Sequence, residues 1–162
     1  MVVRFPPANL DLVAKAMTAS FVLATATAAA LAAVAPSERR VLPLLACIVL
    51  VVLGAICLAF RPTAFVLDEH GLEVRRALRR RRIPAPLTAE RVSLSALVGS
   101  RLVGSGGLFG YLGLFKLDGG ARVGAALTAR RSAVLVRGSG ASVLLSPADP
   151  DGLVRAVAGE AA

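Results

Sequence analysis

Two uncharged, apolar stretches of about 20 residues lie close together near the start of this chain. They cover residues 16–35 and 41–60, and only the short segment 36–40 separates them. An apolar helix of about 20 residues is roughly 30 Å long, which is the thickness of the hydrocarbon core of a bilayer. A helix also satisfies its own backbone hydrogen bonds, which lipid cannot do. The sequence therefore predicts a transmembrane hairpin in residues 1–60 and a separate domain in residues 61–162.

The distribution of positive charge predicts which side of the membrane the two termini occupy. Arg39 and Arg40 lie between the two stretches, whereas Arg61 and six further arginines lie between the second stretch and residue 82. Because cytoplasmic flanks carry the excess of Lys and Arg, we expect a multi-pass protein of the bacterial plasma (inner) membrane with both termini cytoplasmic. The alternative is a signal peptide cleaved after Ala33-Val34-Ala35, which would still leave the C-terminal domain in the cytoplasm.

Small residues recur at every fourth position of the first stretch and suggest how the two helices pack. This stripe consists of Ala16, Ser20, Ala24, Ala28 and Ala32. Small side chains let helix backbones approach closely in lipid, so we expect the stripe to face the second helix. The alternative is that the high alanine content alone produces the stripe. Neither stretch contains an ionisable residue, which argues against transport through an intramembrane charge relay.

Residues 61–162 contain short apolar runs separated by turn residues, a pattern typical of an all-β unit. The expected strands cover residues 63–67, 72–76, 80–84, 91–98, 111–117, 121–128, 132–137 and 141–145. Asp118-Gly119-Gly120 is the clearest hairpin turn, because glycine adopts the positive φ that tight turns need. Asp149 and Pro150 predict the start of a C-terminal helix. The predicted fold class is therefore an α+β membrane protein with seven or eight antiparallel strands and one closing helix.

The order of these features resembles the bacterial PH-domain (pleckstrin-homology-like) family of membrane-anchored proteins. The resemblance is carried by FVLDEHGLEV, RRIPAPLTAERV, GYLGLFKLDGG and AVLVRGSGASVLLSPADPDGLVRAV, and it covers roughly residues 60–158. It implies a PH-like β-roll of about seven antiparallel strands closed by a helix. It also implies a non-enzymatic scaffold in the bacterial cell envelope.

An arginine cluster is the most unusual local feature of the predicted domain. Its members are Arg75, Arg76, Arg79, Arg80, Arg81 and Arg82. A strand that leaves the membrane near Thr63, followed by a partner that returns to Arg76, would bring the cluster back to the bilayer surface. Each arginine there can contribute on the order of 1 kcal/mol of attraction to anionic lipid headgroups. We expect the cluster to hold the domain on lipid; the alternative is a solvated hairpin end that only reinforces the topology.

Other residue patterns give little support for catalysis or metal binding. His70 is the only histidine and lies in an acidic turn, where three adjacent side chains rarely point at one ion. The glycine-rich segment 104–107 lacks the Gly-Lys-Ser/Thr ending of a phosphate loop and is interpreted as a bent connection between strands. Leu108 and Phe109, which follow it, are candidates for contact with lipid or a partner. No catalytic motif is recognisable, so we expect no enzymatic activity, metal or cofactor.

The charge balance of residues 61–162 predicts an acidic partner, since fifteen Lys or Arg oppose eight Asp or Glu. Nucleic acid is disfavoured because the chain has no tryptophan and only 4% aromatic residues for base stacking. The leading hypothesis is a membrane-anchored binding or assembly module for another membrane protein or protein complex. The alternative is a peripheral sensor of anionic headgroups that uses the arginine cluster. Self-assembly into a homo-oligomer is compatible with either.

Overall fold

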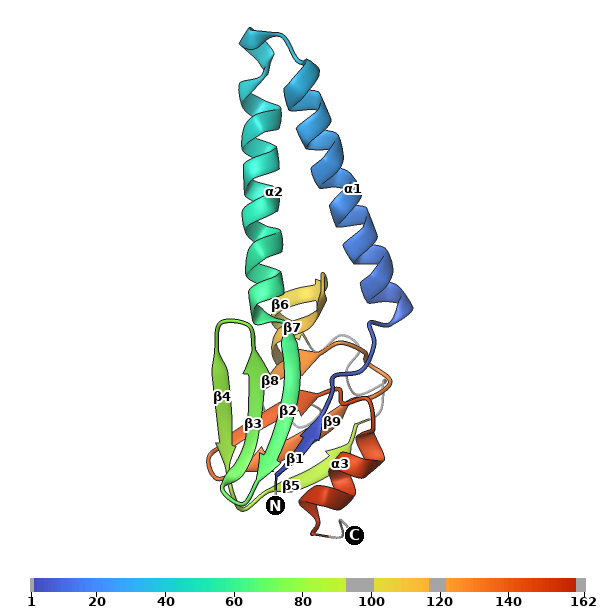
Figure 1. The fold of residues 1–162 in the computed structure, drawn as a ribbon, viewed down its shortest axis with the longest axis vertical. Coiled ribbons are helices and arrows are strands. Elements are labelled where there is room, and N and C mark those ends of the chain that lie inside the picture. The colour runs from blue at the N-terminus through green and yellow to red at the C-terminus, as the bar shows by residue number, and fades with distance from the viewer. Residues whose placement is uncertain (1, 93–100, 117–121, 160–162) are drawn as a thin grey trace.

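The computed structural model describes residues 2–92, 101–116 and 122–159, and it places two long helices above a β-rich domain (Figure 1). The helices are α1 (Leu12–Val34), the short 3₁₀ turn η1 (Ser37–Arg39), α2 (Val41–Phe60) and α3 (Pro150–Val157). The strands are β1 (Val3–Phe5), β2 (Pro62–Asp68), β3 (Gly71–Arg76), β4 (Arg80–Pro84), β5 (Thr88–Arg91), β6 (Arg101–Gly107), β7 (Gly110–Lys116), β8 (Arg122–Leu127), β9 (Val134–Gly138) and β10 (Ala141–Leu145). Strand β1 and helix α3 both lie far from the tip of the helical hairpin (Figure 1).

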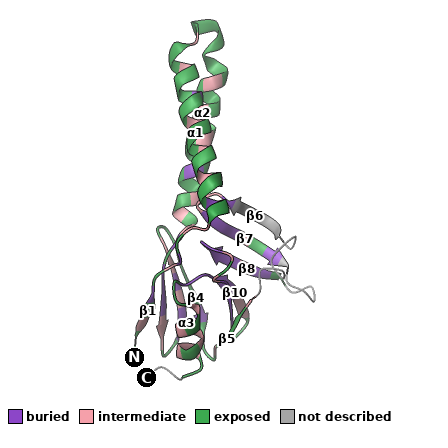
Figure 2. Ribbon diagram, turned by 90° about the vertical axis from the view of Figure 1, so that its right-hand side faces the viewer, coloured by how far each residue is buried: buried purple, intermediate pink, exposed green. Residues whose placement is uncertain are grey.

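Helices α1 and α2 are long and apolar enough to cross a membrane. Their 23 and 20 residues correspond to roughly 35 and 30 Å. Figure 2 shows exposed residues along most of both helices, while buried residues gather in the strands below. Helix α1 begins earlier than the predicted span, because Asp11 caps it by accepting a 2.8 Å hydrogen bond from the Ala14 backbone N–H.

The small-residue stripe of α1 packs against α2 only in part, which corrects the expectation that all of it faces inward. Ala28 is buried and Ala32 is half-buried, whereas Ala16, Ser20 and Ala24 are exposed. The reason is geometric: a four-residue spacing drifts by about 40° per step around a helix of 3.6 residues per turn. Where the two helices diverge toward the domain, Phe21 of α1 makes the contact with α2. Its ring lies so close to Gly54 that a Cβ there would be 2.9 Å from the ring.

The strands form two sheets, and their number and pairing differ from the prediction. One sheet has the order β1-β2-β3-β4, and the other has the order β5-β9-β10-β8-β7-β6. The described residues thus contain ten strands instead of seven or eight. The pair β8 and β10 is parallel, whereas only antiparallel pairs were expected. Most of the predicted strand 91–98 and the predicted turn 118–120 lie outside the described residues.

Strands β1 and β6 were missed because their sequences carry weak strand signals, and β5 overlaps the predicted strand 91–98 only at Arg91. Strand β1 has three residues and precedes the first helix, yet it pairs with β2 through Val3–Leu67 and Phe5–Phe65. The sheet therefore includes residues from before the expected domain boundary at residue 60. Strand β6 contains the glycine-rich segment that was interpreted as a connection, and it pairs with β7. Glycine is depleted in strands, so composition alone argued against it.

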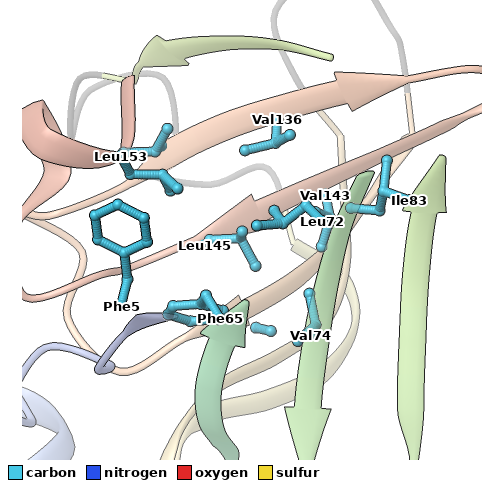
Figure 3. Close-up of a cluster of buried hydrophobic side chains, with 11 residues drawn as sticks. Phe5, Phe65, Leu72, Val74, Ile83, Val136, Val143, Leu145 and Leu153 are labelled. Atoms are coloured by element: carbon cyan, nitrogen blue, oxygen red, sulfur yellow. The ribbon is translucent and has the colours of Figure 1, made fainter. Parts of the chain in front are cut away.

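The core of the domain lies between the two sheets and under α3 (Figure 3). The large, fully buried residues of this cluster are Phe65, Leu72, Val74, Ile83, Val134, Val136, Val143, Leu145 and Leu153. Leu153 comes from α3, which begins where the sequence predicts, because Asp149 accepts a 2.8 Å hydrogen bond from the Gly152 backbone N–H. Phe5 of β1 also packs into the cluster. The segment that precedes α1 is therefore part of the folded domain.

Candidate functional site

The arginine cluster lies at the end of the domain where α2 enters it. Helix α2 ends at Phe60, and β2 begins at Pro62, which pairs with Arg76 at the end of β3. The turn between β3 and β4 is consequently next to the lower end of α2 (Figure 1). This end of the domain is the one that would face a membrane crossed by the two helices.

The register of β3 and β4 divides the cluster between two faces of the sheet. Arg75 lies opposite Arg80, and Arg82 lies opposite Glu73, on the face that points away from the core. On this outer face, Arg75 Nε is 2.6 Å from a Glu73 carboxylate oxygen, and Arg82 Nη2 is 2.7 Å from Asp68 Oδ2. Two of the six arginines are therefore paired with acids of the same sheet.

The other four arginines of the cluster carry positive charge that the described residues leave uncompensated. Within the described ranges, no acidic side chain pairs with Arg76, Arg79, Arg80 or Arg81. Arg76 is half-buried, and its Nε is buried without a hydrogen-bond partner among the described residues. Burial, together with the nearby charges of Arg81 and Arg79, lowers the pKa of Arg76 from its ordinary value. Its guanidinium would gain from an anion placed beside it.

A pocket of about 350 Å³ opens beside this uncompensated charge. Its lining comes from the last turns of α2, from the middle of β7 and β8, and from two arginines of the cluster. The lining residues are Ile56, Cys57, Phe60, Arg76, Arg81, Leu112, Gly113, Leu114, Gly124 and Ala125. The pocket thus joins an apolar wall, continuous with α2, to a pair of cations. Sequence reasoning missed it, because residues from five separate elements meet there: α2, β3, β4, β7 and β8.

The turn between β6 and β7 docks on the first helix. Its residues Leu108 and Phe109 are half-buried. The Phe109 backbone N–H donates a 3.1 Å hydrogen bond to Thr18 Oγ1. The Phe109 ring also meets the Phe21 ring edge-on, with 6.5 Å between the centroids. Phe109 therefore contacts α1 of its own chain, about two turns above the start of that helix.

A polar network fixes the base of α1 to β7, and sequence reasoning missed it. Asp11 accepts a 2.9 Å hydrogen bond from the Tyr111 hydroxyl and a 3.3 Å bond from the Arg130 backbone N–H. The Arg130 guanidinium lies 4.9 Å from the centre of the Tyr111 ring. Burial and the bond to Asp11 raise the pKa of Tyr111 to about 12, so its hydroxyl remains a donor at neutral pH. In the sequence, the one signal for this network is Asp11, which comes directly before the apolar run of α1.

His70 lies in an exposed turn, as the sequence suggests. Its backbone N–H donates a 2.9 Å hydrogen bond to Asp68 Oδ1. In the described part of the chain, no group of three or more His, Cys, Asp or Glu residues is arranged to hold a metal ion. The turn therefore provides no metal site from the described residues.

The family model described as a bacterial PH domain matches residues 63–161, which is more than half of the chain. No curated protein and no solved structure matches the chain significantly. The match extends from β2 through α3, so it begins immediately after the helical hairpin and leaves β1 outside its range.

Proposed function

Because the chain belongs to the bacterial PH domain family, we propose that it is a non-enzymatic, membrane-anchored binding module. Its arginine-bearing end lies on anionic headgroups of the cytoplasmic leaflet. The observation that supports this proposal is the uncompensated charge of Arg76, Arg79, Arg80 and Arg81 at the end where α2 enters the domain. Cytoplasmic leaflets carry a negative surface potential that attracts such clusters.

Four of the six arginines in the cluster would provide the attraction to lipid. Arg75 and Arg82 are paired with acids, so four arginines remain to attract lipid, each by about 1 kcal/mol. The most exposed of them lie next to the β3–β4 turn, whose tip residue Leu78 is 83% exposed. This attraction weakens with added salt, because exposed charges are screened beyond about 8–10 Å.

We also propose that the protein spans the bacterial inner membrane twice with both termini in the cytoplasm. The pairing of β1 with β2 supports this topology, because one sheet contains residues from both flanks of the hairpin. In a chain that crosses the membrane twice, this pairing would keep both flanks on the same side. The excess of arginine after α2 favours the cytoplasmic side.

A single tryptophan at position 78 tests the contact with lipid. The natural chain has no tryptophan, so Leu78→Trp introduces a unique fluorophore at the turn of the arginine cluster. In the full-length protein in nanodiscs, we expect brominated lipids to quench this tryptophan more strongly when the bilayer contains phosphatidylglycerol than when it is purely zwitterionic. Replacing Arg79 and Arg80 with Gln in the same chain should reduce the difference. Equal quenching in both bilayers would contradict the proposal.

A second candidate function is assembly with another membrane protein, and a groove between the two helices favours it. The groove has a volume of about 570 Å³ and is lined mainly by apolar residues of α1 and α2, with Phe109 at its base. Small residues such as Ala26, Ala29 and Ala55 line it and would admit a further apolar helix. A detergent-solubilised particle with the mass of more than one chain would support assembly, and a strictly monomeric particle would count against self-assembly.

A further inference from the structure

The pocket beside Arg76 and Arg81 combines features that Arg79 and Arg80 do not share, since neither of these two lines it. Its wall includes Phe60 and Leu114, large apolar side chains that are 42% and 47% exposed. Phe60 ends the helix that would leave the bilayer. The apolar wall is thus located at the level of the membrane surface, where lipid can reach it directly.

The two cations of the pocket come from neighbouring strands, Arg76 from β3 and Arg81 from β4. Arg81 lies opposite Val74 in the β3–β4 register, on the face that points toward the second sheet. Its guanidinium packs against β8, since a Cβ placed on Gly124 would lie 3.0 Å from Arg81 Nη1. Arg76 contributes a buried Nε that has no partner among the described residues. Two guanidinium groups for which the described part of the chain offers no acidic partner therefore line one small pocket.

We propose that this pocket binds one anionic phospholipid of the adjoining leaflet, with its phosphate between Arg76 and Arg81 and the first part of its acyl chains against Phe60 and Leu114. The inference deepens the proposed function and rests on the part of it that places this end of the domain at the membrane surface. Guanidinium groups bind phosphate through paired, charge-assisted hydrogen bonds, which a diffuse headgroup layer does not provide. A water-soluble phosphate would leave the apolar wall uncovered, whereas a lipid covers both parts of the pocket. Its volume also falls within the range of small-molecule sites.

A charge-matched pair of double variants tests the inference. The first is Arg76→Gln with Arg81→Gln, which removes both cations of the pocket. The second is Arg79→Gln with Arg80→Gln, which removes the same charge from exposed neighbours that do not line it. Each full-length protein is placed in phosphatidylcholine nanodiscs with a minor fraction of phosphatidylglycerol, then transferred to detergent. The phosphatidylglycerol that remains bound is measured by native mass spectrometry.

We expect the natural chain and the Arg79/Arg80 variant to retain one phosphatidylglycerol, and the Arg76/Arg81 variant to retain about tenfold less or none. Leu114→Trp, which keeps every charge and fills the pocket from an exposed position, should also lose the lipid. Excess glycerol 3-phosphate should not displace it; displacement would indicate a site for free phosphate and overturn the assignment to lipid. Unfolding curves show whether each variant is folded.

Other outcomes separate this inference from the proposed function. The pocket would be overturned if the two double variants lost equal amounts of bound phosphatidylglycerol while Leu114→Trp retained it. Only the general attraction to anionic lipid would then remain. Retention of lipid in all variants would also overturn the pocket. If the tryptophan at position 78 failed to distinguish anionic from neutral bilayers while one lipid was still retained, the surface contact would be wrong and the pocket would stand.

Discussion

Replacing Asp11 with alanine is expected to lower the free energy of unfolding by roughly 3 kcal/mol. The carboxylate caps α1 and also accepts hydrogen bonds from the Tyr111 hydroxyl and the Arg130 backbone N–H. Alanine removes the cap and leaves half-buried donors without their charged acceptor. Tyr111 is the only tyrosine and the chain has no tryptophan, so its fluorescence reports on this site directly. The measurement is denaturant unfolding of the full-length protein in detergent micelles.

Asp149→Ala is the matched control, since Asp149 is also a helix N-cap. Its side chain is exposed and caps α3 through the Gly152 backbone N–H, so we expect a loss of only about 1 kcal/mol.

A second control is pH. Burial raises the pKa of Asp11, but the hydrogen bonds from Ala14, Tyr111 and Arg130 outweigh it and lower the pKa from its ordinary value.

The sign of the pH effect follows from this lowered pKa. The ionised carboxylate is favoured by folding, so its stabilisation is present above the pKa of an unfolded aspartate and is lost as the pH falls through the lower, folded-state pKa. The difference in stability between the natural chain and Asp11→Ala should therefore narrow in acid. A difference that stays constant down to pH 2 would show that the charge of Asp11 is not responsible.

Replacing Leu72 with alanine should lower the free energy of unfolding by about 2–5 kcal/mol. Leu72 is fully buried in the cluster between the two sheets, where its side chain packs among residues of both (Figure 3). Alanine would leave a cavity that the surrounding strands cannot close completely. The measurement is the shift of the denaturant midpoint at constant slope.

Leu78→Ala provides the control for this change, because the same side chain is removed from a position that is 83% exposed. We expect a change within about 0.5 kcal/mol. If both leucines gave the same small loss, the two sheets would not share a tightly packed core.

The helices and most strands could be predicted from the sequence because their signals are local. An uncharged run of about 20 apolar residues indicates a helix long enough to span a bilayer wherever it occurs. Strands β4 and β10 were predicted with the observed limits. Turn residues bound β10 on both sides, with Gly138-Ser139-Gly140 before it and Ser146-Pro147 after it. The start of α3 could be predicted for the same reason, because its cap joins Asp149 to Gly152, only three residues later.

Strand β1 shows the limit of this approach. Its partner β2 follows more than fifty residues later, beyond both helices, and nothing in three residues indicates such a pairing. The parallel pairing of β8 with β10 could not be predicted from the sequence either, because β9 lies between them in the chain. Pairings of this kind depend on the whole fold.

The sequence by itself determined that the chain has two membrane-length helices, a β-rich domain and a basic segment, because hydropathy, turn residues and charge are properties of neighbours. It did not distinguish among the six arginines. Only the tertiary structure decided that Arg75 and Arg82 meet acids, while Arg76 and Arg81 line a pocket with α2, β7 and β8. The physical reason is that alternation along two paired strands assigns each side chain to a face, and only packing between sheets decides what that face meets.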